Sequence, residues 1–89
     1  MIEIAFSSSF KKIFKKKIKA NEELETKFWK AIQTFIFDPF DASLRTHKLS
    51  GQLKDLWSFS VEYDTRIVFY FEEKNKAVLI NIGKHDEVY

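Results

Sequence analysis

The chain has 89 residues and a formal net charge of +2, which leaves room for one domain with one small core. We therefore predict a single domain over residues 1–89, whose buried area comes largely from ten Phe, two Trp and three Tyr. The absence of cysteine excludes a disulfide framework and thiolate metal sites. No stretch approaches the roughly twenty apolar residues of a membrane span, and residues 1–6 are too short for a signal peptide. We expect a cytoplasmic protein with no membrane partner.

Basic side chains concentrate near the start of the chain. Residues 1–30 hold eight Lys and four Glu, a net charge of +4, whereas residues 31–89 hold seven Lys or Arg and nine Asp or Glu, a net charge of −2. Such a cationic block favours a polyanion, because each lysine that meets a phosphate releases counterions. A solvated helix face and an acidic protein partner are the alternatives. The lysines without an intervening acid are Lys11, Lys12, Lys15, Lys16, Lys17 and Lys19.

The first half of the sequence predicts a strand followed by two helices. Apolar and polar residues alternate over 2–6, which is typical of a short strand. The serines at 7–9 offer helix caps, and apolar residues then recur at helical spacing as far as Ile18. Asn21 predicts a second cap, and Asp38-Pro39 ends that helix. We expect the two helices to form an antiparallel hairpin.

The second half predicts loop and then strands. Residues 38–52 have mainly the composition of a loop, and apolar residues alternate with polar ones from Leu53 onward. Turns at 63–65 and 73–76 divide this part into three strands, the last at 77–82. The order β-α-α-β-β-β predicts an α+β fold, with a mainly antiparallel four-stranded sheet and an α-helical hairpin packed on one face.

Several kinds of chemistry find no support in the sequence. There is no glycine-rich phosphate loop, HExxH motif or paired-cysteine motif. The two histidines, His47 and His85, are thirty-eight positions apart and lack the local spacing of metal ligands. A hydrolase triad of Ser50, His85 and Asp86 has no nucleophile elbow around it. We predict neither a metal site nor a cofactor.

A better arrangement comes from the three predicted strands. Arg66 begins one strand and His85 follows its neighbour, so the intervening turn places both at one end of the sheet. His47 and Lys48 belong to the segment that enters the same sheet, and Tyr89 closes the sequence. This mixture suits a phosphodiester, because arginine clamps a phosphate, histidine transfers the protons of a 2′-hydroxyl attack, and tyrosine stacks on a base.

Each of these residues also has a structural interpretation. For Arg66 it is an ion pair with an acid of its own turn, and for His47 a hydrogen bond within its own loop. For Tyr89 it is packing of the terminus on the sheet, and for Asp64 it is the turn itself, where aspartate is common.

Taken in order, these segments resemble the RelE/ParE superfamily of bacterial toxins, and in particular the RelE and YafQ-like messenger-RNA interferases. The resemblance covers essentially the whole chain, including the lysine-rich first helix and the Asp-Pro that follows the second. The segments that carry it are His47–Phe59 (HKLSGQLKDLWSF), Asp64–Tyr70 (DTRIVFY) and Ile82–Tyr89 (IGKHDEVY).

The resemblance implies a toxin that cleaves mRNA on the ribosome and is silenced by a cognate antitoxin in a hetero-oligomeric complex. His85 falls on the family's catalytic C-terminal position, Arg66 on its phosphate-binding arginine and Tyr89 on its terminal aromatic. His47 and Asp64 fall on positions of YafQ-like members. YafQ-like toxins often carry a second histidine before that aspartate. Here the nearest residue is Ser60, which leaves His47 as the expected general base and His85 as the general acid.

Seven lysines are predicted to bind RNA: Lys11, Lys12, Lys15, Lys16, Lys48, Lys54 and Lys84. Two alternative functions remain open at this point. One is a DNA gyrase inhibitor of the ParE branch, and the other is a degraded toxin that only binds its antitoxin.

Overall fold

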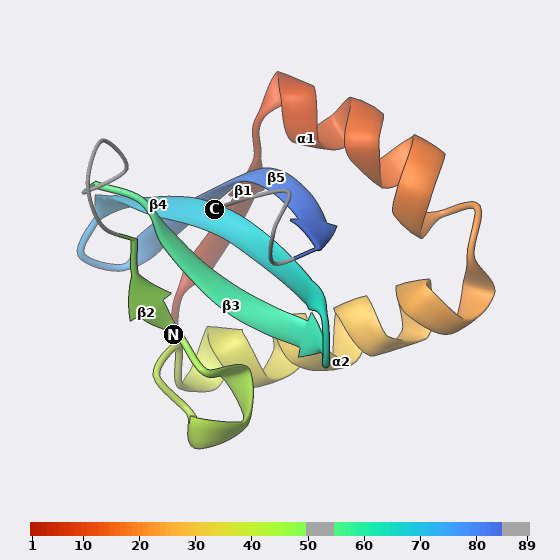
Figure 1. The fold of residues 1–89 in the computed structure, drawn as a ribbon. Helices are drawn as coiled ribbons and strands as arrows, with labels where there is room; N and C mark the ends of the chain where they lie inside the picture. The colour runs from red at the N-terminus through yellow and green to blue at the C-terminus, as the bar shows by residue number, and fades with distance from the viewer. Residues whose placement is uncertain (50–54, 85–89) are drawn as a thin grey trace.

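Residues 1–49 and 55–84 are described by the structure, a computed structural model, and they form a sheet with helices on one of its faces (Figure 1). The strands of this described part are β1 (Glu3–Phe6), β2 (His47–Lys48), β3 (Trp57–Glu62), β4 (Thr65–Glu73) and β5 (Lys76–Lys84). Its helices are α1 (Ser8–Ile13) and α2 (Glu22–Phe37), with a π-helical segment η1 (Phe14–Ile18) and a 3-10 helix η2 (Ala42–Leu44).

Polar side chains begin both helices at the predicted positions. Ser7 Oγ accepts a hydrogen bond of 3.0 Å from a backbone N–H in the first turn of α1, and Asn21 Oδ1 accepts one of 3.1 Å in the first turn of α2. Each bond satisfies one of the N–H groups that have no partner within a first turn. The second helix ends at Phe37, because Asp38 precedes Pro39 and such a residue avoids the helical region. These predictions are confirmed.

The first helix differs from the uninterrupted pattern that its periodicity predicts. From Phe14 the backbone widens into η1, where the N–H of Lys19 donates to the carbonyl of Phe14 at 2.7 Å, five residues back. Ile18 nevertheless remains fully buried. The helices meet at residues 19–21 and diverge from there in Figure 1, so that α1 contacts β5 while α2 contacts β3.

The sheet order is β1-β5-β4-β3-β2. β1 runs parallel to β5, and the other neighbouring strands are antiparallel. The α+β class and the chain order of the four long strands are confirmed, but the described sheet has five strands rather than four. The additional strand is β2, which lies within the predicted loop 38–52 and pairs with Trp57 and Ser58. Two residues are too few for a period-two pattern to be recognised, so only the pairing reveals this strand.

Aromatic side chains form the core between the sheet and the helices. The ring of Phe35 on α2 lies 4.8 Å from that of Phe59 on β3 and 5.0 Å from that of Phe69 on β4, centroid to centroid. All three side chains are fully buried, and each buried phenylalanine stabilises the fold by about 1.5–3 kcal/mol. The described helices include none long and apolar enough to cross a membrane.

Successive residues of a strand point to opposite faces of a sheet, and this alternation decides where the polar side chains go. Phe59 and Ile67 enter the core. Their neighbours Ser60 and Arg66, which lie opposite each other in the β3–β4 pair, therefore share the face away from the helices. This face carries the candidate site.

Candidate functional site

Arg66 is placed by three adjacent strands. In the register of the sheet it lies opposite Ser60 of β3 on one side and opposite Gly83 of β5 on the other. Its Nη1 donates a hydrogen bond to Ser60 Oγ, and the missing side chain at Gly83 leaves room beside it. Arg66 Nε is buried and has no hydrogen-bond partner in the described structure. A buried N–H without a partner is costly and calls for an explanation, and a guanidinium that lines a cavity is explained by the binding of an anion.

His47 lies on the same face of the sheet, toward the β2 edge. It is opposite Ser58, which is in turn opposite Val68, two residues along β4 from Arg66. The imidazole Nδ1 is 3.0 Å from the backbone carbonyl oxygen of Arg45. A carbonyl only accepts, so Nδ1 carries the proton and, in the neutral ring, Nε2 is the basic nitrogen. The predicted hydrogen bond within its own loop is therefore present, and it selects the tautomer that a general base toward the substrate requires.

Arg45 is brought to the same site by the turn that ends η2. It has φ 51° and ψ 39° and is the only non-glycine residue with positive φ in the described chain. Its side chain is exposed and lines a cavity of about 310 Å³ together with Arg66, Ser60 and Tyr63. On the side of β3 away from β4, β2 pairs only with Trp57 and Ser58, so no described strand covers residues 59–62 on that side, and the cavity opens along this edge.

Among the described residues, Glu62 contributes the only carboxylate to this cavity. Its Oε1 is 3.2 Å from Lys27 Nζ, and its Oε2 accepts a hydrogen bond of 3.3 Å from Thr65 Oγ1. Hydrogen bonds and ion pairs with Glu23 and then Glu62 raise the pKa of Lys27 above its ordinary value. Because Glu62 is already engaged, neither Arg45 nor Arg66 takes part in an ion pair within the described part of the chain. The predicted pairing of Arg66 with an acid of its turn is not observed, and the cavity remains cationic.

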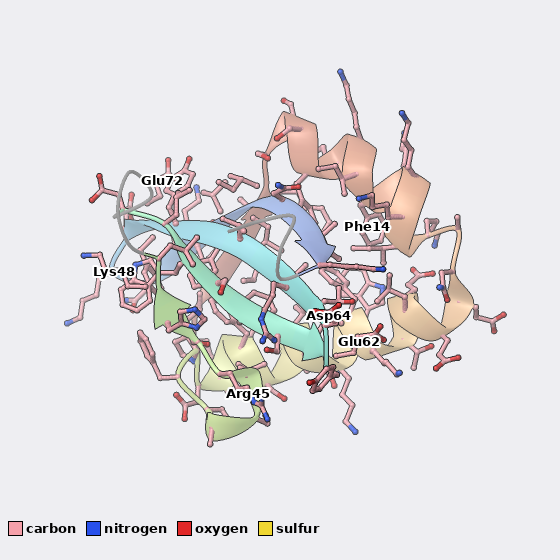
Figure 2. All side chains as sticks on the ribbon, viewed as in Figure 1. Phe14, Arg45, Lys48, Glu62, Asp64 and Glu72 are labelled. Carbon is pink, nitrogen blue, oxygen red and sulfur yellow. The ribbon has the colours of Figure 1, made fainter. Side chains whose placement is uncertain are left out.

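Three other predicted site residues lie on the strands or on the turn between them, and Figure 2 labels two of these, Lys48 and Asp64. Asp64 is exposed in the turn between β3 and β4, at the opposite end of β3 from Lys48. Lys48 lies opposite Trp57, with its Nζ 6.0 Å from the centre of the indole ring, so it points to the other face from His47. Lys84 lies opposite Thr65 at the end of β5. The structure thus brings His47 and Arg66 to one face and leaves these two lysines away from it.

Three predicted residues, Lys54, His85 and Tyr89, lie outside the described residues, and their roles stay predictions. The last described residues of β5 are informative nonetheless. Gly83 and Lys84, which directly precede His85 in the sequence, pair with Arg66 and Thr65. The turn at 73–76 therefore brings the start of β4 beside the end of β5, and the position of His85 itself stays a prediction.

The predicted RNA-binding lysines of the first helix, Lys11, Lys12, Lys15 and Lys16, are all exposed. Two of them, Lys11 and Lys15, line an apolar cavity of about 340 Å³ together with Lys19 and the rings of Phe6 and Phe14.

Trp29 adjoins this cavity, with 45% of its surface exposed. Its ring centroid lies 6.4 Å from that of Phe6 and 5.9 Å from that of Phe14. We call this group of three rings and three lysines the aromatic–lysine surface.

Two contributors to the site were not predicted as functional residues. Ser60 stands where a histidine was expected and was given no role of its own. In the structure its Oγ accepts a hydrogen bond from the Arg66 guanidinium. Arg45 was missed entirely. The sequence did contain a signal for Arg45. Arg45 and Arg66 are the only arginines of a chain whose other cationic residues are lysines, and arginine is the residue type that binds phosphate through two nitrogens. Within the described residues, no group of three or more His, Cys, Asp or Glu side chains is arranged to hold a metal ion.

Comparison with known proteins now identifies the family. A family model described as the bacterial toxin of type II toxin–antitoxin system, YafQ, matches residues 2–89. The chain belongs to this family. The resemblance inferred from the sequence segments is thereby confirmed, and the protein is a toxin of the type II toxin–antitoxin class. No curated protein sequence matches the chain.

Solved structures confirm the fold of the toxin. A copper-bound mutant toxin from Helicobacter pylori superposes with a TM-score of 0.79 at 22% identity, over 100% of both chains. YafQ from E. coli strain BL21(DE3) gives a TM-score of 0.75 at 20% identity, over 100% of this chain and 99% of that one. The YoeB–YefM complex from Staphylococcus aureus gives 0.76 at 16% identity, over 96% and 98%.

Proposed function

We propose that this toxin is an endoribonuclease that cleaves messenger RNA on the ribosome. The observation that carries the proposal is the state of Arg66, a guanidinium on the face away from the helices, with a buried unpartnered Nε and no acidic partner in the described chain. Such a group is suited to the negative charge that develops on a phosphodiester under attack. Membership of the YafQ family supports the same chemistry.

In the proposed reaction, His47 Nε2 takes the proton of an RNA 2′-hydroxyl. The bond from His47 Nδ1 to the Arg45 carbonyl keeps the ring in the required tautomer during this step. The 2′-oxygen attacks phosphorus, and the P–O2′ bond forms as the P–O5′ bond breaks. Arg66 neutralises the charge on the non-bridging oxygens.

We assign the proton of the leaving group to His85, which in the sequence directly follows the residues of β5 that pair with Arg66 and Thr65. Protonated His85 donates to the departing 5′-oxygen, so that the products are a 2′,3′-cyclic phosphate and a 5′-hydroxyl. Tyr89 orients the nucleotide by stacking. Asp64, exposed in the turn two residues before Arg66, is assigned a weaker role in holding this arrangement. No step of this reaction requires a metal or a cofactor.

The lysines of α1 and η1 extend the proposed interface to ribosomal RNA. They are exposed on the outer side of the first helix, and a cationic helix face attracts phosphates over a large area. The lysines do not take part in the chemistry.

We also propose that a cognate antitoxin covers the aromatic–lysine surface with an acidic helical segment. The floor of this surface is formed by Phe6, Phe14 and half-exposed Trp29, and lysines rim it. An antitoxin helix with an apolar side chain would pack on the aromatic floor, and carboxylates beside that side chain would pair with the lysines of the rim. Since Lys11 and Lys15 belong to both proposed interfaces, the antitoxin and the ribosome compete for the toxin. The YoeB–YefM complex is an assembly of a protein with the same fold.

The antitoxin interface is tested by coexpression with a small acidic protein encoded beside the toxin gene. The wild-type pair should copurify and relieve growth arrest, whereas Trp29→Ala should weaken the complex without changing the melting temperature by more than a few degrees. Lys74→Ala, in the exposed β4–β5 turn, is the control. Equal affinities of the antitoxin for the Trp29 and Lys74 variants would place its binding elsewhere.

The catalytic proposal is tested by primer extension on mRNA after controlled expression, followed by cleavage with purified ribosomes. His85→Ala should lower the rate of cleavage by about 10²–10⁴-fold, the usual contribution of a positioned acid. Arg66→Ala should lower it by a comparable factor. Both variants should keep the fold and antitoxin binding, and Lys74→Ala should cleave like the parent.

Two further measurements define the reaction class. Cleavage should continue in EDTA wherever ribosomes tolerate it, and the 3′ ends should carry a 2′,3′-cyclic phosphate or a 3′-phosphate. If His85→Ala cleaved as fast as the parent, the assignment of the acid would be wrong. Intact mRNA together with trapped DNA gyrase would instead identify a gyrase inhibitor, and intact mRNA with active gyrase would identify a degraded toxin.

A further inference from the structure

Both arginines of the sequence line a single cavity. The chain contains many lysines but only Arg45 and Arg66 as arginines, and the two belong to segments twenty-one positions apart that the fold brings to the same 310 Å³ space. Lysine is a point charge, whereas arginine offers a planar fork that matches phosphate oxygens. Because both guanidinium groups line the same cavity, we infer that it binds more than one phosphate group.

The backbone of Arg45 supports a function for its side chain. A non-glycine residue in the left-handed region is disfavoured, and glycine or asparagine is the usual occupant. The hydrogen bond to His47 uses only the Arg45 carbonyl, which every residue type supplies. Neither the turn nor that bond therefore calls for arginine. Strained positions of this kind concentrate at ligand-binding sites.

Tyr63 adds an aromatic ring to the same cavity. It lies in the β3–β4 turn, lines the cavity and has 90% of its surface exposed. An exposed ring beside two guanidiniums is the combination by which proteins hold single-stranded nucleic acid, with the base stacked and the phosphate charge neutralised. The nearby hydroxyl of Ser43 is directed to Asp41 Oδ1 at 2.6 Å, so the anion-binding capacity of the cavity comes from the arginines.

We propose that this cavity is a second nucleotide subsite, adjoining the scissile position, in which Arg45 binds the next phosphate of the RNA strand and Tyr63 stacks on its base. The proposal rests on the ribonuclease function proposed above. It extends the bound substrate from one phosphodiester to a single-stranded segment that follows the edge of β3 away from β4, along residues 59–62. Arg66 then serves the scissile phosphate and Arg45 its neighbour.

The test uses a trinucleotide with 2′-O-methyl riboses, which keeps two phosphates but has no attacking hydroxyl. In ¹⁵N–¹H NMR spectra at mildly acidic pH, the two arginines give two Nε–Hε signals, and Arg45→Gly assigns them by removing one. Both signals should shift when the trinucleotide binds the wild-type toxin. A stationary Arg45 signal overturns the subsite.

Three variants separate the side chain from the backbone. Arg45→Gly keeps the left-handed turn and the carbonyl that holds His47, so the melting temperature should stay the same or rise. Its affinity for the trinucleotide should fall about tenfold, and the slope of log affinity against log salt should fall by about 0.7, the value for one phosphate on a single strand. Arg45→Lys should recover the slope. Tyr63→Ala should weaken binding about tenfold with no change of slope.

The two proposals fail in different ways. Unchanged affinity and slope in Arg45→Gly overturn the second subsite, whatever the rate of mRNA cleavage. If His85→Ala leaves cleavage intact while Arg45→Gly still weakens trinucleotide binding, the catalytic assignment is wrong and the subsite holds.

Discussion

Arg66 donates a hydrogen bond to the hydroxyl of Ser60 across the β3–β4 pair. The bond holds the guanidinium over the sheet face away from the helices, with the side chain beside Gly83 and its Nε buried. A residue that stands where a histidine was expected therefore positions the guanidinium that we propose as the phosphate clamp. We infer that the proton-transfer role of that histidine has moved to another residue, and His47 is the candidate.

Ser60→Ala should lower mRNA cleavage about tenfold, because Arg66 loses the acceptor that fixes its orientation and a hydrogen bond to a charged group contributes about 1.5–3 kcal/mol. The change should be seen in the rate at saturating ribosome concentration rather than in ribosome affinity. Ser8→Ala, at an exposed position of α1, is the matched control. Equal rates for both variants would show that Ser60 does not position Arg66.

If ribosomal RNA shares the proposed role of the base, His47→Ala should slow cleavage less than His85→Ala, which removes the proposed acid of the leaving oxygen. The single-turnover rate on programmed ribosomes measures both effects. The melting temperature of His47→Ala should stay close to that of the parent, since the side chain is exposed. A larger loss in the His47 variant than in the His85 variant would contradict the sharing of the base role by ribosomal RNA.

Replacing Lys12, Lys15 and Lys16 by Gln should weaken ribosome association and flatten its dependence on salt. If each lysine meets one phosphate, the slope of log affinity against log salt should fall by about 2–3. Lys74→Gln, far from the first helix in the β4–β5 turn, should leave the slope unchanged. A triple variant with the parental slope would indicate that these lysines form only a solvated face.

Phe35→Ala should lower the free energy of unfolding by about 3–5 kcal/mol, because it leaves a cavity between two strands and α2. Phe37→Ala is a matched control two residues further along the same helix, and it should cost less than about 0.5 kcal/mol. The two side chains are 0% and 76% exposed, respectively. Urea denaturation measures both, and similar losses would contradict the observed packing of α2 on the sheet.

Local signals in the sequence were enough to predict most elements. The caps at Ser7 and Asn21 and the stop at Asp38-Pro39 act within one turn of the chain, so neighbouring residues alone decide them. The alternation after Trp57 likewise predicted three antiparallel strands, and the turns set the β4–β5 register that places Gly83 beside Arg66. The family resemblance followed from short segments of the same kind.

Other features depend on residues that meet only in the folded chain. β2 exists because His47 and Lys48 find hydrogen-bonding partners on β3, and two residues carry no pattern of their own. Arg45, at the end of η2, likewise reaches the cavity beside β3 only in the folded chain.

The sequence by itself determined most of the elements, their order and the family, because these depend on periodicity, capping and motifs that are local along the chain. Tertiary structure alone decided that Arg45 and Arg66 share a cavity, that Ser60 holds the guanidinium and that Lys48 lies on the other face from His47. The physical reason is strand pairing. A register fixes which side chains lie across from one another, and a displacement of one residue would send each of them to the opposite face.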